Sequence, residues 1–452
     1  MATNVEKSYI DLYKDYKEVL CKKSAEPLNA HREEAFEIFS SIGFPNSNIE
    51  EYRHTDLTED HAVDYGLNIN RVNPVGNESE LIKCEVHGIK SYLFFVVNDT
   101  FFCPKESLSA LEELRAKGVK VGSLHDYAVS DAPIVEKHYN KIAPKKEPYA
   151  AFNTIFAQDG FFLHVPKGVQ LDQPIQLIFV TRGNAPIMSN TRNLIIIEEG
   201  AKAQVLVCTH TMGEVKALSN RVTEVFVGEN ATYDHYKLEN TNLQSLNLGS
   251  LYINQEKGSN VLVNEITLHN GKTRNNVKID LNGEYCETIL CGMAVADSKE
   301  HIDNFTAINH NSPNCKSKEL YKYVLDGEAC GVFSGRIFVK EGAQKTEAYQ
   351  TNKNVCMKPT ARMFTQPQLE IYADDVKCSH GASTGLMDDN ALFYLRSRGI
   401  PEKEAKMLLM NAFVDDVLEN IRIEALKDKI RQLVEKRFRG ELSRCAGCSV
   451  CG

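Results

Sequence analysis

The chain has 452 residues and a formal net charge of −9, and 42% of its residues are hydrophobic and 25% charged, as in ordinary globular proteins. The acidic balance argues against nucleic-acid binding. The lack of an apolar leader, or of an apolar run of about 20 residues, argues against secretion and membrane insertion. Thirteen cysteines dispersed along so long a chain do not form the pattern of a secreted disulfide scaffold. We therefore expect a cytoplasmic protein with reduced thiols that binds neither nucleic acid nor membrane.

Residues 1–145 predict a mixed, mainly helical N-terminal domain. Apolar residues recur at intervals of three and four within 5–20 and 29–43, which is the spacing of an amphipathic helix. Strand-like sequence, including "YLFFVV", follows within 80–103, and residues 107–145 again have a helical pattern. The N-terminal domain thus combines helices with a short β segment.

Residues 146–385 predict a β core. Short runs rich in Val, Ile, Leu, Phe and Tyr alternate with turns, and four similar turns contain Gly200, Gly228, Gly258 and Gly283, at spacings of 28, 30 and 25 residues. A turn that recurs at this long period, with several strands between, indicates the stacked coils of a β-solenoid. A large β-sandwich or barrel, whose turn signals recur about every 8–12 residues, is the alternative.

Residues 386–440 predict a helical C-terminal domain. Asp388 can cap a first helix that Gly399 ends, and Pro401 suits the first turn of the next helix. Apolar residues then follow helical spacing along one face. Residues 422–444 hold eight Lys and Arg against four Asp and Glu, a surplus that fits either a solvated helix face or a docking surface for an acidic partner.

Motifs of several common enzyme classes do not occur in the chain. A Walker A phosphate loop, a dinucleotide-binding GxGxxG and an HExxH zinc motif are all absent. A solenoid enzyme acting on polysaccharide would need exposed carboxylates along one coil, whereas the Asp pairs at 374–375 and 388–389 lie at the ends of a predicted strand and helix. The missing motifs do not exclude an enzyme, but they remove the commonest enzyme classes.

The densest polar segment is "DDVKCSHGASTG" at residues 374–385. Within a strand, Cys378 and His380 project from the same face, and a thiolate with an imidazole suits iron or zinc. Two ligands do not complete a tetrahedral site, so others would come from elsewhere in the chain or from another chain. A buried cysteine beside a hydrogen-bonded histidine is the structural alternative. Two other combinations are more typical of core residues: Cys208 with His210, and His301 with His310 and Cys315.

Four blocks of the chain resemble one known family. Residues 373–417, "ADDVKCSHGA…", resemble the C-terminal signature of the SufD branch of the SufB/SufD family, which belongs to the SUF iron–sulfur cluster assembly system. Residues 50–57, "EEYRHTDL", resemble the family's aromatic-basic-aromatic-Thr-Asp motif, with His54 where an aromatic residue is usual. Residues 152–179 and 303–354 resemble the family's β core. The "KCSHGA" form is typical of SufD, whereas SufB is expected to carry an "HEA" version.

The resemblance implies a fold and a set of partners. It implies a right-handed parallel β-helix between helical N- and C-terminal domains, which matches the solenoid prediction. It also implies pairing with a SufB-like subunit through the β-helices, and a SufC-like ATPase that docks on the C-terminal helices and would explain the absent Walker A motif. The residues of this chain that match the docking region are Leu408, Leu409, Phe413 and Val417.

The resemblance also implies a role for the polar segment. His380 matches the family histidine implicated in binding a transient iron–sulfur cluster or iron at the subunit interface, with Cys378 as an accessory ligand and the remaining ligands from SufB. The resemblance therefore implies that the chain is a non-catalytic scaffold subunit. Flavin binding by the complex, and homodimer formation when SufB is absent, are left open by the sequence.

The last segment, 441–452, contains Cys445, Cys448 and Cys451 at regular spacing and lies beyond the resemblance. CxxCxxC spacing recurs in iron–sulfur ligand runs, which generally add a fourth cysteine. The tail is consistent with metal, cluster or sulfur handling, with a redox pair, or with incidental cysteines at a terminus. A stand-alone metalloprotein that holds its metal through this tail is therefore the alternative function.

Overall fold

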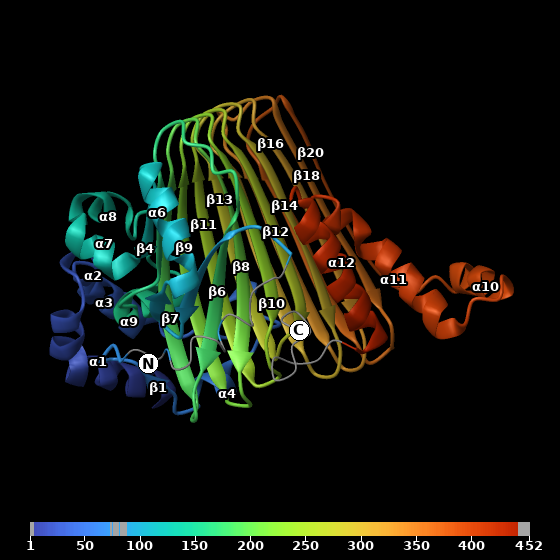
Figure 1. Ribbon diagram of the computed structural model, residues 1–452. Helices are drawn as coiled ribbons and strands as arrows, with labels where there is room; N and C mark the ends of the chain where they lie inside the picture. The colour runs from blue at the N-terminus through green and yellow to red at the C-terminus, as the bar shows by residue number, and fades with distance from the viewer. Residues whose placement is uncertain (1–3, 73–74, 76–80, 82–87, 442–452) are drawn as a thin grey trace.

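The computed structural model describes residues 4–72, 75, 81 and 88–441, and its main feature is a β-solenoid (Figure 1). The chain alternates between two sheets, so that each coil adds one strand to each sheet, and every strand from β5 to β18 pairs in parallel with the strand of the next coil. The predicted parallel solenoid is thereby confirmed, and the sandwich or barrel alternative is not. The Cys-rich tail lies outside the described residues.

The first sheet contains β1 (Gly66–Leu67), β4 (Lys120–Ser123), β5 (Phe161–Val165), β7 (Ile187–Ile197), β9 (Ala217–Val227), β11 (Ser245–Gln255), β13 (Lys272–Leu281), β15 (His301–His310), β17 (Cys330–Val339) and β19 (Arg362–Ile371). The second sheet contains β2 (Tyr92–Val97), β3 (Thr100–Phe102), β6 (Ile175–Arg182), β8 (Lys202–Met212), β10 (Thr232–Asn240), β12 (Asn260–His269), β14 (Glu287–Ala296), β16 (Lys316–Leu325), β18 (Thr346–Cys356) and β20 (Val376–Leu386). Apolar side chains of both sheets fill the space between them.

The recurring glycine turn of the sequence forms a corner of the solenoid. Gly200 and Gly258 have φ values of 65° and 68°, and Asn230, at the equivalent place in the coil between them, has 54°. This left-handed conformation favours glycine and asparagine. At Gly283 a Cβ atom would lie 1.9 Å from the backbone nitrogen of Lys257 in the preceding coil, so close stacking excludes a side chain. The spacing of the similar turns in the sequence therefore reflects one corner of the solenoid, which is repeated in successive coils.

Helices cover the N-terminal end of the solenoid and parts of the outer faces of both sheets. They are α1 (Asn4–Lys23), α2 (Glu26–Asn29), α3 (Arg32–Ile42), α4 (Thr58–His61), α6 (Leu108–Ala116), α7 (Leu124–Ser130), α8 (Ala132–His138), α9 (Pro148–Phe156), α10 (Asp389–Ser397), α11 (Glu402–Leu418) and α12 (Glu424–Arg439), with short 3₁₀ turns at Glu50–Tyr52 and Lys105–Ser107. The two predicted N-terminal helices correspond to α1 and α3. Strand β2, which is almost entirely buried, joins the second sheet beside β6.

The C-terminal helices pack against the outer face of the second sheet (Figure 1). Leu426, Ile430 and Leu433 of α12 belong to the same buried cluster as Ile266 and Met293 of that sheet. The predicted cap is present, because the Asp388 side chain accepts hydrogen bonds from the N–H groups of Asn390 and Ala391. Helix α10 projects away from the solenoid, beyond its last coil.

Intramolecular ion pairs engage much of the basic surplus on α12. Arg437 pairs with Asp297 at 2.7 Å and with Glu300 at 2.9 Å, and Arg431 pairs with Asp415 at 3.0 Å. Lys427 and Arg439 likewise contact carboxylates of α11, α12 and the turns beside them. These basic side chains therefore neither stand free on a solvated helix face nor await an acidic partner, because carboxylates of the same chain already pair with them.

Candidate functional site at the open end of the solenoid

The last coil, formed by β19 and β20, leaves the solenoid open at its C-terminal end. Strand β20 pairs with β18 along its whole length, and no strand within residues 88–441 pairs with its other edge. Residues 379–386 of this strand are exposed. Such an edge presents a row of unpaired N–H and C=O groups that can pair with another chain.

Cys378 and His380 lie on this strand, and alternation places both on the side that faces the solenoid interior. Cys378 is half-buried and packs against a cluster that includes Ile337 and Ala348, and burial raises the pKa of its thiol. His380 is exposed, because no further coil covers it. No group of three or more His, Cys, Asp or Glu side chains suited to a metal ion occurs in the described part of the chain. Cys378 and His380 therefore lie on the same face of β20, and no third ligand among the described residues joins them.

A polar column leads from His380 into the solenoid. His380 is in register with Gln350 of β18, which is in register with Glu319 of β16. Gln350 Nε2 donates to Glu319 Oε2 at 2.7 Å and Thr306 Oγ1 donates to Glu319 Oε1 at 2.5 Å. Burial nevertheless raises the pKa of Glu319 to about 7. The interior below His380 is therefore polar and contains a carboxyl group that is partly protonated near neutral pH.

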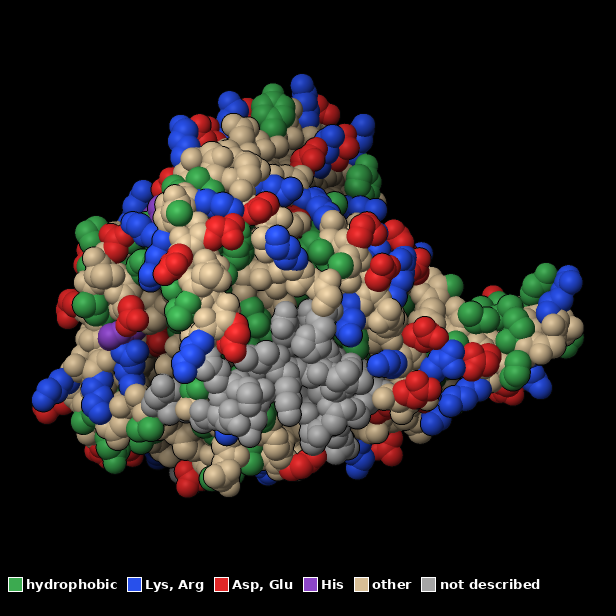
Figure 2. All heavy atoms as spheres, in the orientation of Figure 1, with side chains coloured by type: hydrophobic (Ala, Val, Ile, Leu, Met, Phe, Trp, Pro, Cys, Tyr) green, Lys and Arg blue, Asp and Glu red, His purple; other side chains and the backbone are tan. Residues whose placement is uncertain are grey.

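An apolar surface covers the projecting arm made of α10 and the start of α11. Phe393, Tyr394 and Leu386 are 74%, 57% and 67% exposed, and Leu408 is 45% exposed. Figure 2 shows hydrophobic side chains gathered on this arm. The sequence interpretation missed Phe393 and Tyr394, although two adjacent aromatic residues in a helix of only nine residues were a usable signal.

The four residues predicted to form a docking region have different environments. Leu408 is exposed, and Leu409 lines a cavity of about 270 Å³ beside Leu386. Phe413 is partly buried, and the Lys322 ammonium lies 4.7 Å from its ring centroid. Val417 is fully buried against the second sheet, so it is unavailable to a partner and we remove it from the docking set.

The "EEYRHTDL" motif forms a strap across the outer face of the first sheet. The Tyr52 ring lies under the guanidinium of Arg274, 4.2 Å from ring centroid to Cζ, and Arg274 Nη1 donates to the carbonyl of Glu51 at 2.7 Å. His54 stacks on Phe364 with ring centroids 3.9 Å apart and planes 7° apart. The imidazole therefore supplies the flat ring that the family motif normally provides at this position.

The other histidine and cysteine combinations are not assembled into a site. Cys208 lies in the apolar cluster on the outer side of the second sheet. His301 and His310 are at opposite ends of β15 and contact Thr55 and Ser317, respectively, both through Nε2 at 3.0 and 2.9 Å. Burial lowers the pKa of His310 to about 4, as expected for a structural residue.

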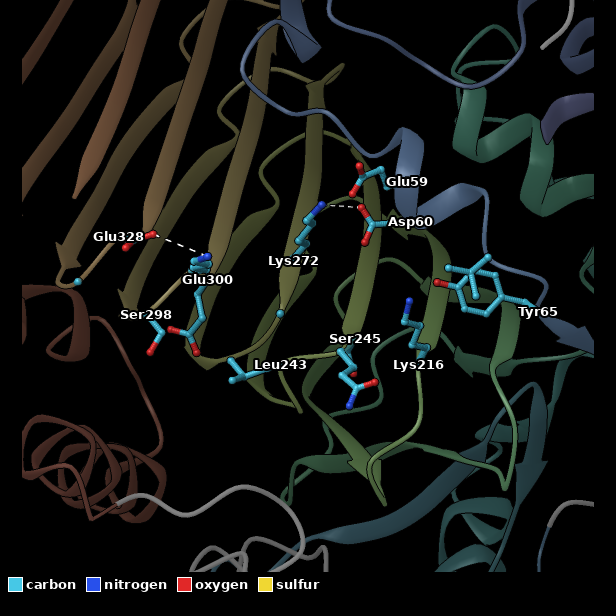
Figure 3. A pocket seen from close by; sticks show the side chains of 15 residues that line it. Glu59, Asp60, Tyr65, Lys216, Leu243, Ser245, Lys272, Ser298, Glu300 and Glu328 are labelled. Atoms are coloured by element: carbon cyan, nitrogen blue, oxygen red, sulfur yellow. Dashed lines mark hydrogen bonds and ion pairs between the residues drawn. The ribbon is translucent and has the colours of Figure 1, made fainter. Parts of the chain in front are cut away.

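A cavity of about 700 Å³ lies at a corner of the solenoid below α4 (Figure 3). Among the charged side chains that line it, Lys272 pairs with Asp60 at 2.6 Å and Lys299 with Glu328 at 4.0 Å, while Glu300 pairs at 2.9 Å with Arg437, which lies outside the lining. We assign no substrate to this cavity. In the described ranges of the chain, none of the helices is long and apolar enough to cross a membrane.

Comparison with known proteins agrees with this architecture. The family model described as the SufBD core domain of SUF system FeS cluster assembly matches residues 179–413, and that of the SufBD protein N-terminal region matches residues 3–177. An iron–sulfur cluster assembly SufBD family protein of Synechocystis is 28% identical over 90% of both chains. The iron–sulfur cluster assembly protein SufD of Escherichia coli is 32% identical over 66% of this chain and 71% of its own. SufD of Bacillus subtilis is 28% identical over 74% and 77%.

Proposed function

Because the chain belongs to the SufB/SufD family of iron–sulfur cluster assembly proteins, we propose that it is a non-catalytic scaffold subunit that pairs with a SufB-like chain through its last coil. The observation that carries this proposal is the open edge of β20, which brings His380 to the place where a second chain would add its own strand. In this proposal the nascent iron–sulfur cluster is cargo that the site binds, and it is not a resident cofactor of the chain.

The edge of β20 lacks the features that usually prevent pairing. Exposed edge strands are normally blunted by proline, by several charged residues or by a bulge. Strand β20 has one charged residue, Lys377, near its start, no proline, and an unbroken register with β18. Neighbouring β19 contains Pro367, which removes one backbone donor. These features support β20 as the strand that contacts the SufB-like subunit.

His380 is the proposed cluster ligand, with Cys378 as an accessory ligand. An imidazole and a thiolate both suit iron, and an exposed His380 is accessible to a partner. A SufB-like chain would supply the ligands that these two lack. We assign no flavin contact to any residue of this chain.

The exposed arm is the proposed docking surface for a SufC-like ATPase. Leu408 and Leu409 belong to the predicted region, and Phe393, Tyr394 and Leu386 extend it. Exposed apolar patches of this kind mark protein–protein contacts. ATP hydrolysis would then take place in the partner.

The proposal is tested by iron and acid-labile sulfide content of the complex purified anaerobically after co-expression with SufB-like and SufC-like chains. We expect His380→Ala to lower both severalfold while the subunits still co-purify. Ser379→Ala, on the other side of the same exposed strand, is the matched control and should leave both unchanged. Equal cluster content in the His380→Ala and wild-type complexes would refute the ligand role.

The tail alternative is separated by a truncation after Gly440. If cysteines 445, 448 and 451 hold a permanent centre, the chain purified alone should contain iron or zinc, and the truncation should remove it. If the tail takes no part, the truncated and full-length complexes should have the same cluster content.

A further inference from the structure

Two cysteines that the proposed function does not use lie next to each other in consecutive coils. Cys286 directly precedes β14 and Cys315 directly precedes β16, and the following residues, Glu287 and Lys316, are partners in the parallel ladder. The Lys316 N–H donates to the Cys286 carbonyl at 2.8 Å. Adjacent strands are about 4.8 Å apart, which is within the Cα separation that a disulfide spans.

The two side chains converge on one atom. Cys286 Sγ lies 3.1 Å and Cys315 Sγ lies 3.2 Å from the carbonyl oxygen of Gly283. Both cysteines are fully buried, yet the turns just before them, at residues 282–285 and 311–314, reach the surface, and Tyr285 is 56% exposed. A small oxidant therefore has to pass only one turn to reach the thiols.

The pair also has the electrostatics of a reactive dithiol. The hydrogen bond with Cys315 lowers the pKa of Cys286 to about 7, and the same bond raises the pKa of Cys315. Cys291 on β14 provides an internal comparison, because it is equally buried but burial raises the pKa of its thiol. Thiolates are the nucleophilic form of cysteine, so Cys286 is the thiol primed to react.

We propose that Cys286 and Cys315 form a reversible disulfide that links consecutive coils when the protein meets a peroxide. The Cys286 thiolate attacks one oxygen of hydrogen peroxide, the O–O bond breaks, and a sulfenic acid and hydroxide form. The Cys315 sulfur then attacks the sulfenic sulfur, the S–O bond breaks, and water leaves with the proton of Cys315. In total, two thiols and one peroxide give one disulfide and two waters. A dithiol reductant reverses the step by thiol–disulfide exchange.

The test is peptide mapping of the full chain after treatment with hydrogen peroxide, alkylation of free thiols in denaturant, and tryptic digestion. Cleavage after Lys278, Lys299 and Lys316 separates peptides 279–299 and 300–316, and the tail cysteines fall in another peptide. We expect a linked pair of these peptides with a mass about 2 Da below the sum of the two, the loss of two hydrogen atoms. Cys291, in peptide 279–299, should be alkylated, and dithiothreitol should abolish the link.

Single variants assign the order of the steps. In Cys315→Ser, Cys286 should be trapped by dimedone as a sulfenic acid, and in Cys286→Ser, oxidation of Cys315 should be at least about tenfold slower. Wild-type protein in which both cysteines remain alkylatable, while cysteines of the tail peptide are oxidised, would overturn the proposal. Linkage that forms only in denaturant would also overturn it. Because the wild-type map decides the question, a variant that fails to fold does not obscure the result.

Discussion

Replacement of Glu224 by glutamine should release residues 140–143 from the first sheet. Glu224 is fully buried, pairs with Arg192 at 2.7 Å, and accepts hydrogen bonds from the N–H groups of Asn140, Ile142 and Ala143 at 2.8, 2.9 and 3.2 Å. Glutamine has a single acceptor oxygen, so it leaves the Arg192 charge uncompensated and turns an amide toward a backbone N–H. Breaking a buried ion pair on one side costs about 3–5 kcal/mol.

Hydrogen exchange measured by mass spectrometry is the assay, because it reports this segment directly. A loss of about 3 kcal/mol corresponds to exchange roughly 150-fold faster at the N–H groups that donate to the carboxylate. Glu229→Gln, which changes an exposed glutamate in the next turn of the same sheet, should have no effect. Exchange in Glu224→Gln within about threefold of wild type would refute the ion-pair reasoning, since 1.4 kcal/mol corresponds to about tenfold.

The same carboxylate predicts a pH dependence. Burial raises the pKa of Glu224, but Arg192 and the N–H donors outweigh burial and hold it below its ordinary value of 4.5. A lowered folded-state pKa stabilises the protein above 4.5, and this contribution is lost as pH falls further. Below pH 4.5 the difference in exchange between wild type and Glu224→Gln should therefore shrink.

Three further changes test other parts of the structure. Gly283→Ala should abolish stable folding or lower the melting temperature strongly, because a Cβ atom would lie 1.9 Å from backbone of the preceding coil, whereas Gly342→Ala, with no atom within 4 Å, should melt like wild type. His54→Ala should lose about 0.5–1.5 kcal/mol of the free energy of unfolding, the range for an aromatic pair, and His54→Phe should retain it; equal unfolding midpoints for the two variants would contradict the stacking role. Glu319→Gln should gain stability relative to wild type as pH rises from 4.5 to about 8. The raised pKa of about 7 means that ionisation of Glu319 costs the folded wild-type protein up to about 3 kcal/mol, a cost that glutamine does not have. A pH-independent difference in melting temperature between the two proteins would argue against that pKa.

The sequence by itself determined the repeating parts of this protein. The glycine period predicted the solenoid because one corner conformation, with positive φ at Gly200, Asn230 and Gly258, recurs in successive coils. Asp388 predicted a helix start because its cap uses only the next few residues. The "KCSHGA" block predicted the family, and alternation along one strand placed Cys378 and His380 on a common face. All of these signals are local.

Only the tertiary structure decided which surfaces remain free. Val417 and Leu408 share one apolar pattern, yet the sheet buries Val417 and leaves Leu408 exposed. The pairing of Cys286 with Cys315 depends on the register between coils, which neither segment specifies alone. Strand β20 has a free edge because it belongs to the last coil, and the place of a coil in the stack is decided by the tertiary structure. Register relates segments about 30 residues apart, and the burial of Val417 relates α11 to a strand 153 residues away. Hydrophobic packing is non-directional, so neither relation can be read from one segment alone.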